Sequence, residues 1–597
     1  MALAIPVLGL GAFAVMSLLS GPAQATPTNV CTWNGRASTD MTNNTNWTAN
    51  SGGTCGSGSG AGTARLSGAQ LVFPATIPST GSTLDLNASL SPDDIVFKGS
   101  YTLTGTTYTL TLSGANNLVS NWPVAIDATS GTSTIGSAVA FSNGVDLEAS
   151  SGAGVIVTGT VSGSGGGVIV NSNGGSGTIA LSGDDSTSLS VAIFVDNGTL
   201  EVENDTALGS TSGVSVAPGA ELDLEGGLSI PSSIDVTSLS GTLGEFGTGS
   251  VTWAGTIHLT GSSGTVSANS GYTLDVTGAI SGAALTTSGG GTVKLSGTNT
   301  NTYTGGTTVA DFGTLVAAGS GDALGTGAVA VVGTSTLVLD PSSAQAYGNT
   351  LVLGSGEGGF DVLQDGSSTN ADSWTGGVTL TTNSSGVIES ASPSDGSYAS
   401  GSFVVSGVIG NSGSGSLYTA GNVTLSGTNT YTGGTGGTTV YSGTLDVTGS
   451  IANSNVTVDP VTTLEGTGLT GPVSCDGTLL PGAPGAPGAL SVAGAAFGPQ
   501  PDPPTLAVDI TGKTPGSGHS QLDSAGSVLL SSTTVLQVTD SYAAPYGTVF
   551  DIVTSDGITG AFANASNGAT ITSTGGRLLR VGYTSTEVTL TDVTLAR

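Results

Sequence analysis

Apolar and polar residues alternate in short runs along most of the chain. The runs are often three residues long, as in Val293-Lys-Leu295, Val423-Thr-Leu425 and Leu445-Asp-Val447. Successive side chains of a β-strand point to opposite faces, so Val and Leu share one face and the polar residues share the other. Because each run is too short to form a sheet by itself, the pattern predicts many short strands that bury one face against their neighbours.

One longer stretch returns almost letter for letter. VKLSGTNTNTYTGGTTV spans residues 293–309 and VTLSGTNTYTGGTGGTTV spans residues 423–440, and a Gly-Thr-Leu follows each of them. A looser copy at 181–202 keeps the Leu-Ser-Gly and Gly-Thr-Leu ends but lacks the tyrosine and the paired glycines. From the alternation we expect the core of the repeat to consist of Val293, Leu295, Val309, Leu315, Val423, Leu425, Val440 and Leu445.

Further short strand patterns follow each Gly-Thr-Leu at a regular spacing. Leu315 precedes Leu337 by 22 residues, and Leu445 precedes Leu464 by 19. A recurrence of about 20 residues with glycine at the corners is what a parallel β-solenoid needs, because each coil buries its inward residues by stacking on the next. With 100 glycines and only 8% charged residues, the composition also favours an all-β fold. We therefore predict a right-handed parallel β-helix with N-terminal and C-terminal β caps.

The repeated phrase resembles the autotransporter-associated β-strand repeat, which is found in passenger regions of large secreted and surface proteins of bacteria. The copies at 293–317 and 423–447 match it strongly, and the copy at 181–202 matches it weakly. The resemblance implies a parallel β-helix, a surface or extracellular location, and no catalytic residues within the repeat. The strong copies cover under a tenth of the chain, so the prediction for the remainder depends on the looser periodicity.

Two kinds of side chain recur inside the repeat copies. Asn and Thr follow Leu-Ser-Gly, where we expect them to pair with backbone groups at the corners of coils. Tyr303 and Tyr431 occupy the same place in the two strong copies. They either pack against a neighbouring coil or present a platform for carbohydrate.

Residues 1–25 predict a signal peptide. An apolar run to Leu19 is followed by a segment that ends Ala23-Gln-Ala25, a signal-peptidase pattern, so the mature chain would begin at Thr26. A basic segment ahead of the apolar run is missing, and a retained membrane anchor is the alternative. We expect export, a secreted or cell-surface location, and no transmembrane span in the mature chain.

Residues 26–125 are predicted to form the N-terminal β cap. Cys31 and Cys55 lie close together in an exported chain, which favours a disulfide. Trp33 and Trp47 lie within the same segment. They either belong to a cap over the first coil or stay exposed and contact a ligand such as a sugar ring, and we favour the cap. Cys475 is expected to be a buried free thiol.

Three boundaries follow from composition. Residues 126–480 are dominated by Gly, Ser, Thr and Val and are assigned to the parallel β-helix with its repeats. Residues 481–504 are rich in Pro and Gly and are assigned to a turn or linker. Residues 505–597 show longer alternating strands and are assigned to a C-terminal cap of antiparallel or mixed strands. They lack the ten-residue strands and aromatic girdles of an outer-membrane barrel, so we expect no translocator in this chain.

The charge is strongly one-sided. Forty acidic residues stand against eight Lys and Arg, which gives a net charge of −32. A surface of this kind repels phosphate backbones, so nucleic acids and anionic membranes are excluded as expected partners. The acidic surface either keeps the protein soluble or recruits cations.

Candidate chemistry is scarce. The two histidines, His258 and His519, have no G-x-S-x-G motif beside them, which argues against a Ser-His-Asp triad. Neighbouring residues of a strand point to opposite faces, so the pairs Asp93-Asp94 and Asp184-Asp185 would not converge within a strand. Residues 354–361 contain a single Gly- and Asp-bearing phrase that is weakly similar to a calcium-binding repeat, which needs tandem copies. We predict no catalytic, cofactor or metal site.

The sequence therefore favours a secreted or cell-surface structural or binding module, in the manner of an adhesin. Cell-surface glycans or proteins are the partners that this class implies. Two alternatives stay open: a polysaccharide-active β-helix enzyme that uses clustered carboxylates, and a passenger whose translocator is encoded separately. A cleft with three or more convergent carboxylates would favour the enzyme, and a smooth surface of small residues would favour the structural interpretation.

Overall fold

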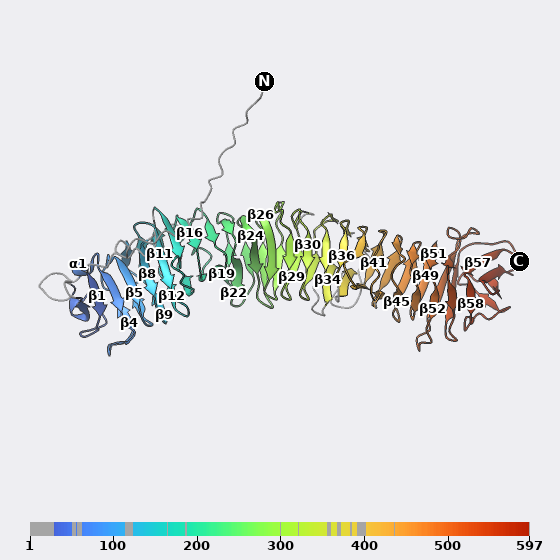
Figure 1. Cartoon of the computed structure of the whole chain (residues 1–597), viewed down its shortest axis with the longest axis horizontal. Coiled ribbons are helices and arrows are strands. Elements are labelled where there is room, and N and C mark those ends of the chain that lie inside the picture. The colour runs from blue at the N-terminus through green and yellow to red at the C-terminus, as the bar shows by residue number, and fades with distance from the viewer. Residues whose placement is uncertain are drawn as a thin grey trace, which may run out of the picture. The chain divides into compact units, whose positions relative to one another are not determined.

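The computed structural model describes residues 29–50, 55, 63–113, 123–163, 165–185, 188–298, 300–319, 322–354, 360–366, 372–381, 385–390, 402–434 and 436–595. The chain divides into two compact units, unit 1 (Met1–Leu222) and unit 2 (Asp223–Arg597). Both consist of β-strands in predominantly parallel sheets, and within each unit the strands follow one another in chain order (Figure 1). The predicted all-β, repeat-like parallel architecture is therefore confirmed.

Helices are short in the part of the chain that the structure describes. They are α1 (Thr63–Leu66) and the 3₁₀ turn η1 (Asn44–Asn46). Within these described ranges, no helix has the length and apolar character that crossing a membrane would require.

Unit 1 contains three ladders of parallel strands, in which each strand pairs with the next member of its ladder. The first ladder holds β1 (Val30–Trp33), β3 (Gln70–Phe73), β5 (Asp94–Phe97), β8 (Val124–Ala128), β11 (Val145–Ala149), β14 (Gly167–Val170), β16 (Ala192–Val195) and β18 (Val214–Val216). The second holds β4 (Thr83–Asp85), β6 (Thr102–Thr104), β9 (Thr132–Ile135), β12 (Gly154–Val157), β15 (Thr178–Leu181) and β17 (Thr199–Val202). The third holds β7 (Thr109–Leu112), β10 (Ala138–Phe141) and β13 (Val161–Gly163).

Unit 2 is organised in the same way, and we number its ladders I to IV. Ladder I holds β20 (Ser229–Ile230), β23 (Val251–Trp253), β25 (Thr273–Val276), β27 (Thr292–Leu295), β29 (Thr314–Ala317), β31 (Thr336–Leu339), β34 (Phe360–Asp365), β37 (Ser385–Ser390), β40 (Ser416–Ala420), β42 (Thr438–Val440), β45 (Val456–Val458), β48 (Val473–Cys475), β52 (Ala495–Phe497), β55 (Ser527–Leu529) and β58 (Gly557–Thr559). Ladder II holds β32 (Ala346–Tyr347), β35 (Ser373–Trp374), β38 (Phe403–Val405), β41 (Asn422–Leu425), β43 (Thr444–Val447), β46 (Thr463–Gly466), β49 (Thr478–Ala483), β53 (Thr505–Ile510) and β56 (Val535–Asp540).

Two further ladders complete unit 2. Ladder III holds β21 (Val236–Leu239), β22 (Thr242–Phe246), β24 (Ile257–Ser267), β26 (Ile280–Ser288), β28 (Thr307–Val309), β30 (Val329–Val331), β33 (Leu351–Leu353), β36 (Val378–Leu380) and β39 (Ile409–Asn411). Ladder IV holds β44 (Ser450–Ile451), β47 (Leu469–Thr470), β51 (Ala489–Val492), β54 (Gln521–Ser524), β57 (Val549–Thr554), β59 (Thr570–Thr572), β60 (Leu578–Tyr583) and β61 (Glu587–Asp592). The strand β19 (Glu221–Glu225) spans the boundary of the two units.

The core of unit 2 lies on the inward faces of these strands. In the four-residue strands β27 (Thr-Val-Lys-Leu) and β43 (Thr-Leu-Asp-Val), the second and fourth residues are buried and the first and third are partly exposed. All eight residues that the sequence assigns to the repeat core have at most 2% of their surface exposed. The alternation of apolar and polar residues therefore identified the inward face correctly.

The two strong repeat copies occupy different ladders. In the first copy, β27 pairs with β29 in ladder I, with Val293 opposite Leu315. In the second copy, β41 pairs with β43 in ladder II, with Val423 opposite Leu445. The same local sequence thus builds the same strand pair in two ladders, so the repeat specifies how adjacent coils stack rather than one particular face.

The glycine of Leu-Ser-Gly lies where two coils approach closely. A Cβ atom added at Gly427 would lie 2.6 Å from the carbonyl oxygen of Gly407, and one added at Gly449 would lie 2.2 Å from that of Gly427. Real Cβ atoms do not approach oxygen so closely, so these positions need glycine because of contact between coils. The glycine-rich composition therefore has a direct role in the stacking.

The N-terminal end differs from the predicted cap. The strand β2 (Trp47–Ala49) pairs antiparallel with β1, but β1 also pairs in parallel with β3, and β3 with β5. Parallel stacking therefore begins at about residue 30 and not at residue 126. The sequence boundary was placed late because composition changes there while the pairing does not.

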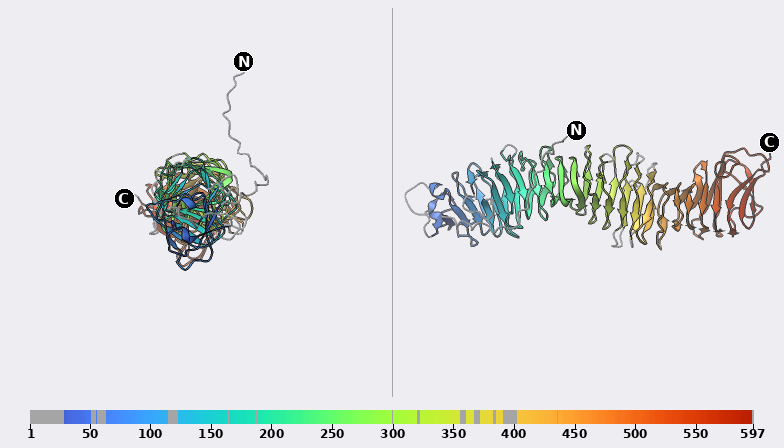
Figure 2. Two further views of the ribbon diagram at one scale, coloured as in Figure 1. Left: turned by 90° about the vertical axis from the view of Figure 1, so that its left-hand side faces the viewer. Right: turned by 45° about the horizontal axis from the view of Figure 1, so that its top comes forward.

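The C-terminal end agrees with the predicted mixed strands of residues 505–597 and with a turn after residue 481, but it differs from the predicted linker. Residues 481–504 are not a linker, because β49 turns back on β50 (Ala486–Pro487) and β51 and β52 continue their ladders. Parallel pairing extends through β58, and the last strands form the antiparallel pairs β57–β61, β61–β60 and β60–β59. Figure 2 shows these last strands in red at the C-terminal end of unit 2.

Candidate functional site

The asparagines of the repeat cap the strands of the neighbouring coil. The Oδ1 atom of Asn301 accepts a hydrogen bond of 2.7 Å from the backbone N–H of Ile280, the first residue of β26. In the second copy, Oδ1 of Asn429 accepts one of 2.7 Å from Ile409, the first residue of β39. In the loose copy, Asp185 aligns with Asn429 and accepts from Val161, the first residue of β13. These side chains therefore satisfy backbone donors inside the stack.

The repeat tyrosines are also internal. Tyr303 and Tyr431 are fully buried, and their hydroxyl groups lie 2.7 Å from the hydroxyl oxygens of Thr307 and Thr438. Burial raises the pKa of both phenols above its ordinary value. The packing interpretation is therefore correct, and a carbohydrate platform built from these rings is excluded by their burial.

The two tryptophans of the N-terminal segment are buried too. Trp33 is 1% exposed and Trp47 is 3% exposed. Their rings meet edge to face with centroids 5.1 Å apart, and the Trp47 ring lies 5.5 Å from that of Phe73. Burial agrees with the favoured cap interpretation and argues against the alternative that Trp33 and Trp47 contact a ligand, because both aromatic rings pack in the core of unit 1.

The cysteines form the predicted disulfide and the predicted buried thiol. Cys31 and Cys55 form a disulfide with Cα atoms 5.6 Å apart, and it ties the segment after β2 back to β1. Cys475 is a buried free thiol in β48. Burial raises the pKa of Cys475 to about 12, which keeps the thiol protonated and unreactive.

The adjacent aspartate pairs do not converge. Asp93 accepts a hydrogen bond from the Ser113 hydroxyl, and Asp94 accepts one of 2.7 Å from Nε2 of Gln70. Asp184 accepts one of 2.8 Å from the Thr206 hydroxyl, whereas Asp185 caps Val161 on a different coil. Each carboxylate therefore has its own structural contact.

The histidines and the calcium-like phrase give no site either. His258 is exposed, with Nδ1 3.0 Å from the Ser281 hydroxyl, and His519 is 1% exposed and packs edge to face on Phe550. Residues 355–359 of the phrase lie outside the described residues, and its Asp361 accepts hydrogen bonds from two backbone N–H groups. Among the described residues, no three or more His, Cys, Asp or Glu are placed to hold a metal ion.

A pair of carboxylates lines a groove on the outward face of ladder II. The groove has a volume of about 320 Å³ and runs over β41, β43 and β46. Asp446 and Glu465 are register partners in adjacent parallel strands, so their side chains stand side by side. The neighbouring wall is formed by Ser402, Thr424 and Pro484.

The environment of this pair favours the protonated form. Glu465 has its pKa raised to about 7, first by burial and then by the negative charge of Asp446. Burial also raises the pKa of Asp446. A hydrogen bond from the Thr424 hydroxyl, whose oxygen lies 3.4 Å from Oδ2 of Asp446, lowers this pKa but does not cancel the effect of burial. The groove therefore holds an acid that titrates near neutral pH beside a second carboxyl group.

Unit 1 contains a related row of acids. Asp127 of β8 is the register partner of Glu148 of β11, and Glu148 also acts on Asp146 and on Asp196, the residue that follows β16. Burial raises the pKa of Asp127 to about 6 and that of Asp146 to about 8. The Ser172 hydroxyl and the Nδ2 atom of Asn173 donate to Asp146, so this acid also anchors the turn after β14.

Sequence reasoning missed both groups of acids. Each of Asp446 and Glu465 follows a leucine that the 19-residue spacing had already aligned, Leu445 and Leu464. That spacing was the signal that could have placed the carboxylates side by side. Acids that are adjacent in sequence do not show this arrangement, because carboxylates that stand side by side in the fold are one coil apart in the chain.

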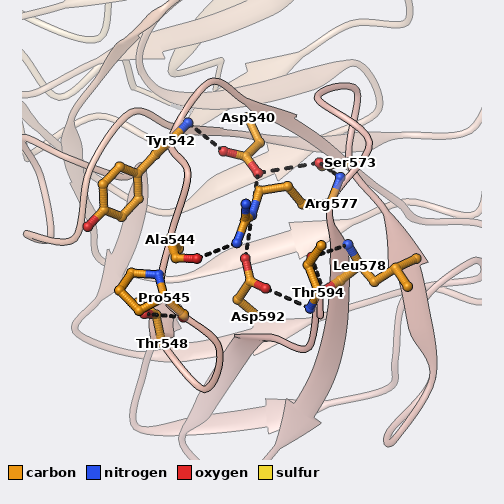
Figure 3. Close-up of polar contacts among 10 residues, drawn as sticks. All are labelled: Asp540, Tyr542, Ala544, Pro545, Thr548, Ser573, Arg577, Leu578, Asp592 and Thr594. Carbon is orange, nitrogen blue, oxygen red and sulfur yellow. Dashed lines mark hydrogen bonds and ion pairs between the residues drawn. The ribbon is translucent and has the colours of Figure 1, made fainter. Parts of the chain in front are cut away.

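A third cluster lies at the C-terminal end of unit 2. Arg577 points between Asp540 and Asp592 (Figure 3), with an ion pair to Asp592 and a distance of 3.9 Å from Nε to Oδ2 of Asp540. Its guanidinium also donates to the carbonyl oxygen of Ala544. Because Asp592 is fully buried, this cluster joins the segment after β56 to the last antiparallel strands.

Comparison with known proteins adds no assignment. A scan against protein-family models gives no match for this chain, and a search of curated proteins gives none either. The functional argument therefore depends on the residues themselves.

Proposed function

We propose that this chain is an exported, right-handed parallel β-helix that serves as a structural or binding module at the cell surface, in the manner of an adhesin. One observation carries the proposal. The residues that the repeat copies share, such as Leu315, Asn301 and Tyr303, are buried inside the stack. Asn301 and Tyr303 also form hydrogen bonds there. The repeats therefore supply the scaffold, and the outward positions, which vary between copies, are left to meet a partner.

The proposed location has its own test. The Ala23-Gln-Ala25 ending supports cleavage after Ala25. Mass spectrometry of the protein from its native host should give an amino terminus at Thr26 in a surface or secreted fraction. An intact Met1 in a membrane fraction would contradict the proposed export.

Binding is tested with the purified mature protein on glycan panels and on intact cells. The proposal predicts retention on a glycan or cell surface, and it predicts that Asp93→Asn and Asp184→Asn variants bind as well as the original chain. These carboxylates have local structural contacts. Failure to bind any surface, combined with turnover of a polysaccharide, would replace the binding module with an enzyme.

The second candidate function is a polysaccharide-active enzyme, and the groove of ladder II is the observation that favours it. Neighbouring parallel strands lie about 4.8 Å apart. This spacing is close to the separation of about 5 Å between the two carboxyl groups of retaining glycosidases. The raised pKa of Glu465 suits the role of a general acid, whereas the raised pKa of Asp446 does not suit an ionised nucleophile.

Release of reducing sugar ends from a panel of polysaccharides separates the two candidates. The enzyme candidate requires turnover that is lost in both Glu465→Gln and Asp446→Asn but retained in Glu587→Gln, an exposed acid on β61. The binding module requires that no polysaccharide is cleaved by the original chain.

A further inference from the structure

Two pairs of acids of this chain are stacked on one another along the ladders. Asp446 and Glu465 are register partners in unit 2, and Asp127 and Glu148 are register partners in unit 1. No described Lys or Arg forms an ion pair with any of these four residues. The sequence explains this, because no basic residue occurs between Lys98 and Lys294 or between Lys294 and Lys513.

The groups that face the unit 2 pair are few. On one side, β41 contributes the Thr424 hydroxyl, and the Ser402 hydroxyl lies 2.6 Å from it. On the other side, β49 places Leu480 opposite Glu465, and the following turn adds Pro484. Among the groups that the structure describes, Asp446 carries the only charge that shifts the pKa of Glu465. Ionising both carboxyls therefore places two like charges in a partly buried groove with no cation between them.

The unit 1 row is enclosed by more groups. Lys98, which follows β5, favours the charged form of Asp127, and Glu148 opposes it. Glu148 also faces Asp146 on its own strand and Asp196 beyond β14. One lysine therefore faces four carboxyl groups, so full ionisation again leaves uncompensated negative charge.

We propose that proton binding by carboxyl groups stacked on adjacent strands stabilises the fold, so that the protein is most firmly held together in acidic surroundings and loosens locally as the medium becomes alkaline. Protonation of one carboxyl group removes the repulsion between Asp446 and Glu465, which lie on adjacent coils. The repetition that stacks leucine on leucine thereby also stacks acid on acid. The same geometry occurs independently in the two units.

The sign of the change in stability with pH follows from the linkage between proton binding and folding. The folded-state pKa values of Asp127, Glu465 and Asp146 are raised to about 6, 7 and 8 from ordinary values of 3.8 to 4.5. A group with a raised folded pKa binds its proton more tightly in the fold. Its stabilising effect is complete below about pH 4 and is lost as the pH rises through 6 to 8. Each proton changes the folding equilibrium by at most tenfold per pH unit.

The test measures amide hydrogen exchange of the full chain by mass spectrometry between pH 5 and pH 8.5, corrected for intrinsic exchange. Peptides that cover β43 and β46 should lose at least tenfold in protection across this range. The loss should shrink in Glu465→Gln and persist in Glu587→Gln, and 1 M NaCl should partly restore protection at pH 8.5 by screening.

The acids of unit 1 provide a second test that does not depend on the Glu465→Gln variant. Asp127→Asn should flatten the pH dependence of peptides from β8 and β11 and leave those of β43 and β46 unchanged. Protection that stays constant or rises from pH 5 to pH 8.5 at both sites in the original chain would overturn the proposal. Unchanged pH dependence in both Glu465→Gln and Asp127→Asn would overturn it as well.

Discussion

Val293 of β27 is the register partner of Leu315 of β29, and both side chains are buried. They are 22 residues apart in the chain, which is the recurrence that the sequence shows. The inward residue of one coil therefore rests on the equivalent residue of the next. Stability in this arrangement is a property of neighbouring coils rather than of single strands.

Truncation of an inward leucine is the first prediction. Leu315→Ala and Leu445→Ala should each lower the free energy of unfolding by about 2–5 kcal/mol, because each leaves a cavity between coils. Chemical denaturation followed by circular dichroism measures the change. The control is Val316→Ala, at a partly exposed position of the same strand, which should cost far less. Equal losses for Leu315 and Val316 would contradict the assigned inward face.

Removal of a capping asparagine is the second prediction. Asn429→Ala leaves the buried N–H of Ile409 without its acceptor, which should cost about 1–3 kcal/mol. Asn429→Asp keeps an acceptor oxygen at the same place and is the matched control. Hydrogen exchange at Ile409 should rise in the alanine variant and change little in the aspartate variant; equal exchange in both would sink the capping role.

The third prediction concerns the arginine at the C-terminal end. Arg577→Leu removes the partner of Asp592, which is fully buried, so an uncompensated charge remains inside the fold. Loss of one partner of a buried ion pair costs about 3–5 kcal/mol. Limited proteolysis should cut the last antiparallel strands first. Arg580→Leu, at an exposed position of β60, should resist proteolysis like the original chain, and matching sensitivity of the two variants would refute the network.

A buried histidine gives the fourth prediction, and its sign is opposite to that of the stacked acids. Burial lowers the folded-state pKa of His519 from 6.5, with Asp551 acting weakly against the shift. The unfolded chain therefore binds the proton first as the pH falls, so the stability contributed by neutral His519 is present above pH 6.5 and is lost below it. After correction for intrinsic exchange, peptides around residue 519 should be less protected at pH 5 than at pH 7.

Replacement of the ring isolates this effect. His519→Phe should remove the acid-induced loss around residue 519, whereas His258→Asn, at an exposed position, should not. Because β43 and β46 respond in the other direction, local exchange separates the two contributions where a single melting temperature would merge them. Persistence of the acid-induced loss in His519→Phe would show that another group causes it.

The inward face could be read from the sequence because it depends on local alternation. Leu295 and Leu425 each lie in a strand whose polar and apolar residues alternate, and burial follows that pattern in both strands. The disulfide was also predictable, because Cys31 and Cys55 are close together in the sequence. These features need only neighbouring residues or a fixed period.

The features that sequence reasoning missed depend on partners one coil away or further. Glu465 is a candidate acid because Asp446 lies beside it on the next coil. Arg577 forms a charged cluster because Asp540 and Asp592 lie on either side of it. The partners of the tryptophans also lie further along the chain, because nothing adjacent in sequence indicates that Phe73 contacts Trp47. The start of parallel stacking was placed too late, because a change in composition does not mark the place where strand pairing changes.

A double-mutant cycle between Val293 and Leu315 tests the stacking of repeat on repeat most directly. Each residue is changed to Ala alone and in combination, and the free energies of unfolding are compared with those of a Val293 and Leu445 cycle, whose residues lie in different ladders. The account predicts a coupling of about 0.5–3 kcal/mol for the stacked pair and additivity within about 0.5 kcal/mol for the separated pair. Additivity for Val293 and Leu315 would contradict it.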